Sequence, residues 1–132
     1  MQQALVSLMQ VRTVSKLQEH CGACEFVVNP TNKMFRDALG ESDVMAVGGA
    51  SLKLETAKRC PPIGTDWDAH MVGVPTDSPL YRCGVRHVIH SVLPDVTQLC
   101  PNGSATPEFL EGAADAVFNV LTAFSSLCPK HA

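Results

Sequence analysis

A short apolar run that leads into an Asn/Pro turn constrains this chain more than any other feature. Phe26–Val28 reads as a strand, and the letters NPTN at Asn29–Asn32 follow it at once. A strand that stops there presents polar side chains and unpaired backbone groups at its carboxyl end, where open α/β sheets bind ligands. A second run of this kind is His87–His90. We therefore expect a binding site after Val28.

Length and charge limit the class of protein. The 132 residues suffice for one domain with a modest core, and at 45% apolar but only 5% aromatic residues that core must consist mainly of Ala, Val and Leu. A net charge of −3 offers no basic surface for phosphates, so we expect no nucleic-acid partner. Without a run of 18 apolar residues, we expect no membrane span.

The first residues do not resemble a secretion signal, so the chain is expected to be intracellular, with cytoplasm, nucleus and organelle left open. Arg12 and Lys16 precede the first acid, Glu19, which weakly resembles an organelle-targeting peptide. The preferred interpretation is a first strand over Ala4–Val11, because that segment has strand character.

The spacing of the cysteines favours free thiols over a metal or redox site. A C-x-x-C pair at Cys21 and Cys24 lies before a strand, whereas a redox motif follows one and opens a helix. A structural zinc would need a second matched pair, which His87 and His90 do not supply. We predict no metal site, with metal binding at Cys21 and Cys24 left open, and six thiols: Cys21, Cys24, Cys60, Cys83, Cys100 and Cys128.

Alternating strand and helix signals follow. An irregular stretch over 33–43 precedes the apolar segment Val44–Ala50, which leads into a helix capped by Ser51 and stopped at Pro61. A strand is expected over Ala69–Thr76, at a sheet edge or strand end because of its proline. The expected elements after it are a turn at Pro79–Gly84 and a strand at Val85–Leu93.

The last element is the clearest. Thr106 is a cap, Pro107 occupies the first helical position, and the helix is expected to run to about Leu127. Its apolar residues lie all around the helix, so we expect it to be buried on more than one side. Gly112 costs on the order of 1 kcal/mol relative to alanine, so tertiary contacts must offset it.

These motifs together resemble a known family, the macro domain, most closely the kind fused to variant histones. The resemblance rests on VVNPTN at Val27–Asn32, the Gly48–Gly49 pair before a helix, the Val72–Gly73 strand, and VIH at Val88–His90 with the alanine-rich helix after it. It spans about 8–127. It implies an α/β fold, a reduced three-layer α/β/α arrangement around a partial mixed sheet.

Macro domains bind ADP-ribose and related nucleotides, and some remove ADP-ribose from proteins. The resemblance places the distal ribose at Asn32 and the phosphates near Gly48 and Gly49, with Asn29 and Ala50 completing the predicted ligand-binding set. A glycine pair before a helix independently allows close approach of an anion. The alternative is that the glycines form a tight turn and that the two asparagines bond locally to backbone.

The chain departs from the family's pattern in two ways, which argue against adenine recognition and against enzyme activity. Where the family places an aspartate that holds adenine, the nearest residues here are Arg12 and Thr13. No base stands beside the glycine pair. We therefore predict no catalytic residue and no cofactor, and hydrolysis of ADP-ribose is not expected.

A macro domain continues past this last helix with a central strand, a second phosphate loop and two further helices. We therefore predict one truncated macro-like domain over 1–132, whose strand Phe26–Val28 has one unpaired edge. The N-terminal strand, a second copy or a partner protein must cover that edge, and the apolar helix Pro107–Leu127 favours the last two.

The predicted function is that of a structural or protein-interaction subunit in a larger assembly, with a degenerate nucleotide pocket. The alternative is a module that binds ADP-ribose or a related nucleotide.

Overall fold

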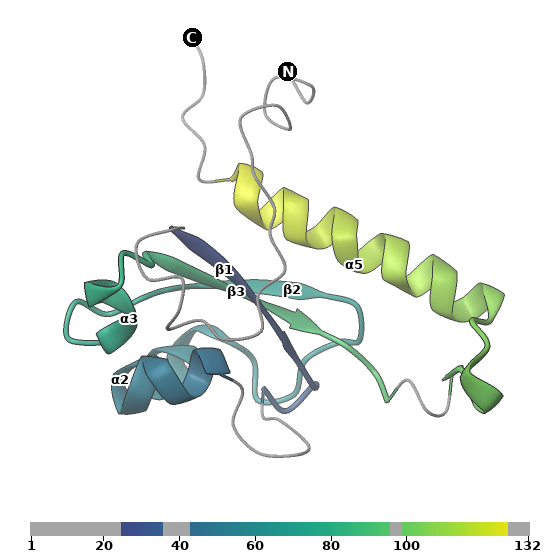
Figure 1. Ribbon diagram of the computed structural model, residues 1–132, viewed down its shortest axis with the longest axis horizontal. Helices are drawn as coiled ribbons and strands as arrows, with labels where there is room; N and C mark the ends of the chain where they lie inside the picture. Colours follow the sequence, from purple (N-terminus) through teal and green to yellow (C-terminus); the bar gives the residue numbers. More distant parts are fainter. Residues whose placement is uncertain (1–24, 36–42, 96–98, 127–132) are drawn as a thin grey trace, which may run out of the picture.

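A mixed sheet of three strands organises the computed structural model, which describes residues 25–35, 43–95 and 99–126. The elements, in chain order, are β1 (Phe26–Thr31), α2 (Asp43–Arg59), β2 (Ala69–Gly73), α3 (Pro79–Arg82), β3 (His87–Val92), the 3-10 turn η2 (Pro101–Gly103) and α5 (Pro107–Ser125). The central strand β3 pairs in parallel with β1 and antiparallel with β2. Figure 1 shows α2 and α3 below the sheet and α5 above it, which confirms the predicted α/β fold with helices on both faces.

Alternation along the strands sorts the core onto two faces. Val27, Val88 and Val72 are register partners across the sheet, and their face packs against α2 and α3. Leu52 of α2 and Leu80 of α3 are fully buried in that cluster. The valines and leucines predicted for the core form most of this cluster, whereas the alanines predicted with them are not part of it.

Strand β1 is longer than predicted. It continues past Val28 through Asn29–Thr31, because each of these residues has a register partner on β3. Pro30 has no backbone N–H to donate, which is tolerated in a strand that lies at the edge of a sheet. Among the described residues β1 pairs only with β3, as expected for a strand with one unpaired edge.

Helix α2 begins at Asp43 and consists of two helical parts joined at Gly49, so the apolar segment Val44–Ala50 is already helical, and Ser51 lies inside the second part instead of capping it. Gly49 interrupts the helix with φ 70° and ψ −166°. A side chain at Gly48 would overlap Leu52, and the Gly48 carbonyl accepts a hydrogen bond from Ser78 Oγ at 2.8 Å. The two helical parts therefore meet where α2 rests on the start of α3.

The segment predicted as a turn at Pro79–Gly84 contains the short helix α3 instead. Ser78 caps it, accepting a hydrogen bond from Leu80 N at 3.3 Å. Strand β2 ends at Gly73 and lies at an edge of the described sheet, and Pro75 follows it, as the sequence predicted.

The cysteines differ in part from the prediction of six thiols. Cys83 is disulfide-bonded, whereas Cys60 and Cys100 are free. The C-x-x-C pair and the strand expected over Ala4–Val11 lie outside the described residues. Within the described ranges, no helix has both the length and the apolar character that a membrane span requires.

Helix α5 confirms its predicted start. Thr106 Oγ1 accepts a hydrogen bond from Phe109 N at 3.2 Å, and Pro107 is the first helical residue. One side of the helix faces β2 and β3, burying Gly112 and Ala116. The opposite side is apolar but exposed, unlike the predicted burial on more than one side; the side chains of Leu110, Val117 and Phe118 are 59%, 61% and 64% exposed.

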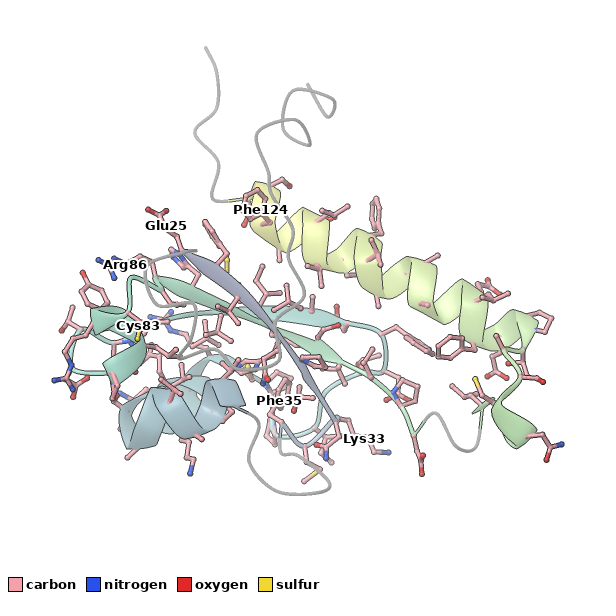
Figure 2. All side chains as sticks on the ribbon, in the orientation of Figure 1. Glu25, Lys33, Phe35, Cys83, Arg86 and Phe124 are labelled. Atoms are coloured by element: carbon pink, nitrogen blue, oxygen red, sulfur yellow. The ribbon has the colours of Figure 1, made fainter. Side chains whose placement is uncertain are left out.

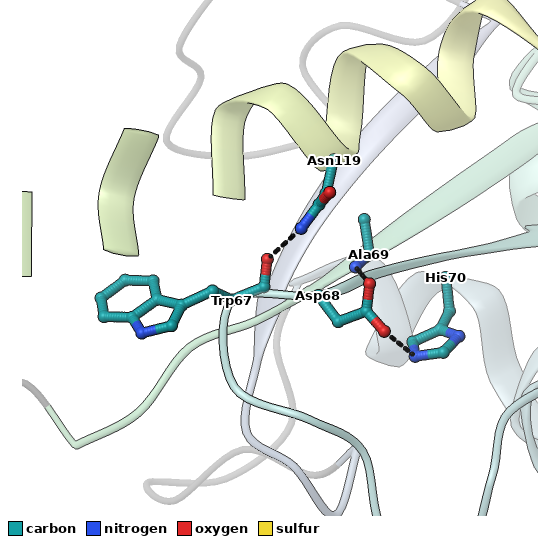
Figure 3. A network of polar contacts seen from close by, with 5 residues as sticks. All are labelled: Trp67, Asp68, Ala69, His70 and Asn119. Atoms are coloured by element: carbon teal, nitrogen blue, oxygen red, sulfur yellow. Dashed lines mark hydrogen bonds and ion pairs between the residues drawn. The ribbon is translucent and has the colours of Figure 1, made fainter. Parts of the chain in front are cut away.

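Gly112 makes room for Trp67, which explains a glycine inside α5. A Cβ at position 112 would overlap the indole ring. The Trp67 backbone is held at φ 72°: its N–H donates to Val92 O at 2.6 Å, and its carbonyl accepts from Asn119 Nδ2 at 3.0 Å (Figure 3). Trp67 thus joins the start of β2 to both β3 and α5.

Gly112→Ala is expected to lower the free energy of unfolding by about 1–3 kcal/mol, because the overlap with Trp67 outweighs the gain in helix propensity. In a Trp67→Leu background the same change is expected to become neutral or stabilising by up to ~1 kcal/mol. Urea unfolding of the wild type, the two single variants and the double variant measures both effects. Equal destabilisation in the two backgrounds would contradict the packing argument.

Candidate functional site

A polar row crosses the sheet next to the row of valines. Asn29 on β1, His90 on β3 and His70 on β2 are register partners, so their side chains share one face of the sheet. That face is the one covered by α2, which contributes Thr56. Asn29, Thr56 and His90 are buried, at 2%, 4% and 1% exposed. Polar groups this deep must find partners inside the protein.

His90 is the centre of the row. Asn29 Nδ2 donates a hydrogen bond to His90 Nδ1 at 3.1 Å, and Thr56 Oγ1 lies 3.1 Å from His90 Nε2. Burial, assisted by the nearby His70, lowers the pKa of His90 to about 4, so the ring is neutral near pH 7. Both ring nitrogens of His90 therefore have hydrogen-bond partners inside the protein.

The turn after β1 rests on this row. Asn32 Oδ1 accepts a hydrogen bond from Met34 N at 3.0 Å, and the Asn32 carbonyl accepts one from Phe35 N at 2.8 Å. Phe35 has φ 57°, and its ring meets His70 and His90 edge-on at centroid distances of 5.5 and 6.1 Å. Figure 2 shows Phe35 on the α2 side of the sheet, near Lys33 at the end of β1.

The side-chain oxygen of Asn29 is not used in the polar row. Its Oδ1 is buried and has no hydrogen-bond partner among the described residues. An unpaired buried acceptor costs roughly 1–3 kcal/mol, so the group is one that a ligand or water would stabilise.

His70 lies beside a carboxylate but has no hydrogen-bond partner for its Nε2 among the described residues. Its Nε2 lies 3.5 Å from Asp68 Oδ2, an ion pair when the ring is protonated but too long for a good hydrogen bond (Figure 3). Asp68 Oδ1 accepts from Ala69 N at 2.9 Å, which fixes the carboxylate at the start of β2. Within the described part of the chain, no group of three or more His, Cys, Asp and Glu side chains could hold a metal ion.

The predicted site residues fall into two groups. Asn29 lies within β1, and Asn32 directly follows the strand. Gly48, Gly49 and Ala50 lie at the break in α2, where Gly48 contacts Ser78 and Gly49 lies nearest to Pro79. The alternative of local backbone bonding fits Asn32, which closes its own turn, but not Asn29, which bonds to a side chain of another strand.

Two residues of this site were missed by sequence reasoning. Thr56 gave no signal, because nothing local marks a threonine inside a helix as the partner of a distant strand. Phe35 lay in a stretch read only as irregular. His90, in contrast, did give a sequence signal, because it alternates with Val88 and Val92 and so shares their buried face.

The free energy of unfolding is expected to depend on pH through His90. Its folded pKa of about 4 lies below the unfolded value of 6.5, so between these values the unfolded chain binds the extra proton. The wild type is therefore expected to lose on the order of 3 kcal/mol of stability as the pH falls from 6.5 to 4.

His90→Gln cannot titrate but keeps an acceptor and a donor, so its unfolding free energy is expected to fall less over the same range. Urea unfolding at several pH values measures the difference between the two proteins. The carboxylates are common to both, so parallel pH profiles would contradict the burial of a neutral His90.

Comparison with known proteins gives one informative result. No family model matches the sequence, and no curated protein sequence matches it. A solved structure, the Oryza sativa APL macrodomain in complex with ADP-ribose, has a similar fold, with a TM-score of 0.70 and 18% sequence identity. The match covers 95% of this chain and 68% of that one. The predicted macro-domain fold is therefore confirmed, over about two thirds of that chain's length.

Proposed function

We propose that this chain, which has the fold of a macrodomain, binds ADP-ribose or a related nucleotide at the carboxyl end of β1. The observation that carries the proposal is the likeness to a macrodomain in complex with ADP-ribose, together with the polar row through Asn29 and the turn at Asn32 that follows β1. In this proposal Asn32 and Asn29 lie at the distal ribose. Hydrolysis is not part of the proposal.

The break in α2 supports the phosphate half of the site. Because Gly49 departs from helical geometry, a new helical segment starts beside it, and the first N–H groups of such a segment have no partner within the helix. Those groups attract anions. Gly49 at φ 70° allows the backbone to take this shape. Ala50 beside it is exposed and has only a small side chain, which leaves room for a ligand at this point of α2.

Calorimetric titration with ADP-ribose is expected to show binding to the wild type and an affinity lowered at least tenfold in Asn32→Ala. Asn32→Asp keeps the oxygen that closes the turn but loses the amide donor, so it separates the two roles of Asn32. Equal loss in both variants is expected if the amide itself contacts the ligand.

The matched control is Glu111→Gln, an exposed position on α5 across the sheet, which is expected to bind like the wild type. No heat and no shift in melting temperature for the wild type at millimolar ADP-ribose would overturn the proposed function.

A second function, that of an interaction subunit, is favoured by the apolar surface of α5. Leu110, Val117 and Phe118 lie at helical spacing and all are more than half exposed. Val28 on β1 is also 46% exposed, beside the edge that has no partner among the described residues. In this case the nucleotide pocket would be degenerate.

We propose a second copy of the chain as the occupant of this surface. A strand edge can pair with the same edge of a copy, and an apolar stripe can pack on the same stripe, so both features are self-complementary about a two-fold axis.

Light scattering after size-exclusion chromatography is expected to show a dimer for the wild type and a monomer for Val117→Asp/Phe118→Asp. These positions are exposed, so folding is expected to survive. The matched control is Leu54→Asp, an equally exposed leucine on α2, which is expected to remain dimeric. A stable monomeric wild type would contradict self-association.

A further inference from the structure

The two hydrogen-bond partners of His90 determine which ring nitrogen carries the proton. Asn29 Nδ2 carries hydrogens and offers no lone pair, so in the 3.1 Å contact it donates and His90 Nδ1 accepts. A neutral imidazole has one N–H, which must then be on Nε2. Nε2 lies 3.1 Å from Thr56 Oγ1, which accepts that proton.

This tautomer decides what Asn29 offers on its other side. With Nδ2 turned toward His90, Oδ1 points away from the ring, and it is the buried oxygen that has no partner among the described residues. A proton on Nδ1 would favour the reverse amide orientation and would leave Nδ2, a donor, in that place. The hydroxyl of Thr56, on the far side of the imidazole, therefore influences whether Asn29 presents its oxygen or its amide nitrogen.

We propose that Thr56 and His90 fix Asn29 as a hydrogen-bond acceptor, so that the inner end of the ligand site takes a donor such as a ribose hydroxyl. The inference rests on the proposed function, which puts the distal ribose at this end of β1. Because Oδ1 is buried, a ligand hydroxyl can bond to it only after a neighbouring group has moved aside. Thr56 and His90 are positioning residues, since they act through Asn29.

The pair Thr56→Val and Thr56→Ser tests the proposal with little change in shape. Thr56→Val removes the acceptor for Nε2–H, and its affinity for ADP-ribose is expected to fall about tenfold, or ~1.4 kcal/mol. Its affinity for ADP, which lacks the distal ribose, is expected to stay within twofold of wild type. Thr56→Ser keeps a hydroxyl and is expected to bind both nucleotides like the wild type.

The tautomer is measured separately, on the wild type and without ligand. The nitrogen-15 shifts of His90 at pH 7 are expected to show a protonated Nε2 and an unprotonated Nδ1. A protonated Nδ1 would overturn the proposal, because Asn29 would then turn its oxygen toward the ring and present its amide hydrogens to the site.

The outcomes distinguish this inference from the proposed function. If the wild type binds neither nucleotide at millimolar concentration, the proposed function fails and the ligand assignment fails with it. If the wild type binds ADP-ribose but Thr56→Val binds it equally well, this inference alone is overturned. An equal loss for ADP-ribose and ADP would assign Thr56 a general structural role and would also overturn it.

Discussion

The neutral, buried His90 in the central strand is the constraint on which the arrangement of the α2 side depends. A ring this deep has lost its contact with water, so each nitrogen needs a protein partner. Asn29 supplies one from β1 and Thr56 supplies the other from α2, at sequence separations of 61 and 34 residues. These two bonds hold three elements in one register, and the row of valines beside them supplies the apolar contacts that exclude water. The polar row is thus tied to the core packing.

Features with a local cause could be predicted from the sequence. The start of α5 followed from Thr106 and Pro107, because a cap and a first-turn proline act within a few residues. Pro75 placed β2 at an edge for an equally local reason. The start of α2 was missed because Val44–Val47 is an apolar run without helical spacing. The Gly48 carbonyl that follows this run accepts a hydrogen bond from Ser78, 30 residues away, a contact that no local pattern reveals.

The site divides in the same way. Asn29 and Asn32 were expected near a ligand because a strand followed by polar residues delivers them to one end of a sheet. The partners that orient them could not be predicted, since Thr56 reaches His90 only after α2 has packed on the sheet. Phe35 depends on the turn that Asn32 closes, and its φ of 57° is not a conformation that a phenylalanine favours by itself. Long-range packing, not propensity, places these groups.

The two proposed functions use opposite faces of the same sheet and meet at β1. Side chains alternate along a strand, so Asn29 points toward α2, whereas Phe26 points toward α5, where its ring contacts Phe124 at a centroid distance of 4.7 Å. Val28 shares the Phe26 face. The surface proposed for a second chain, which comprises α5 and the edge of β1 that has no partner among the described residues, therefore does not include the face of β1 that carries Asn29. The two proposals therefore depend on different side chains of the same strand, and the substitutions that test one leave the residues of the other unchanged.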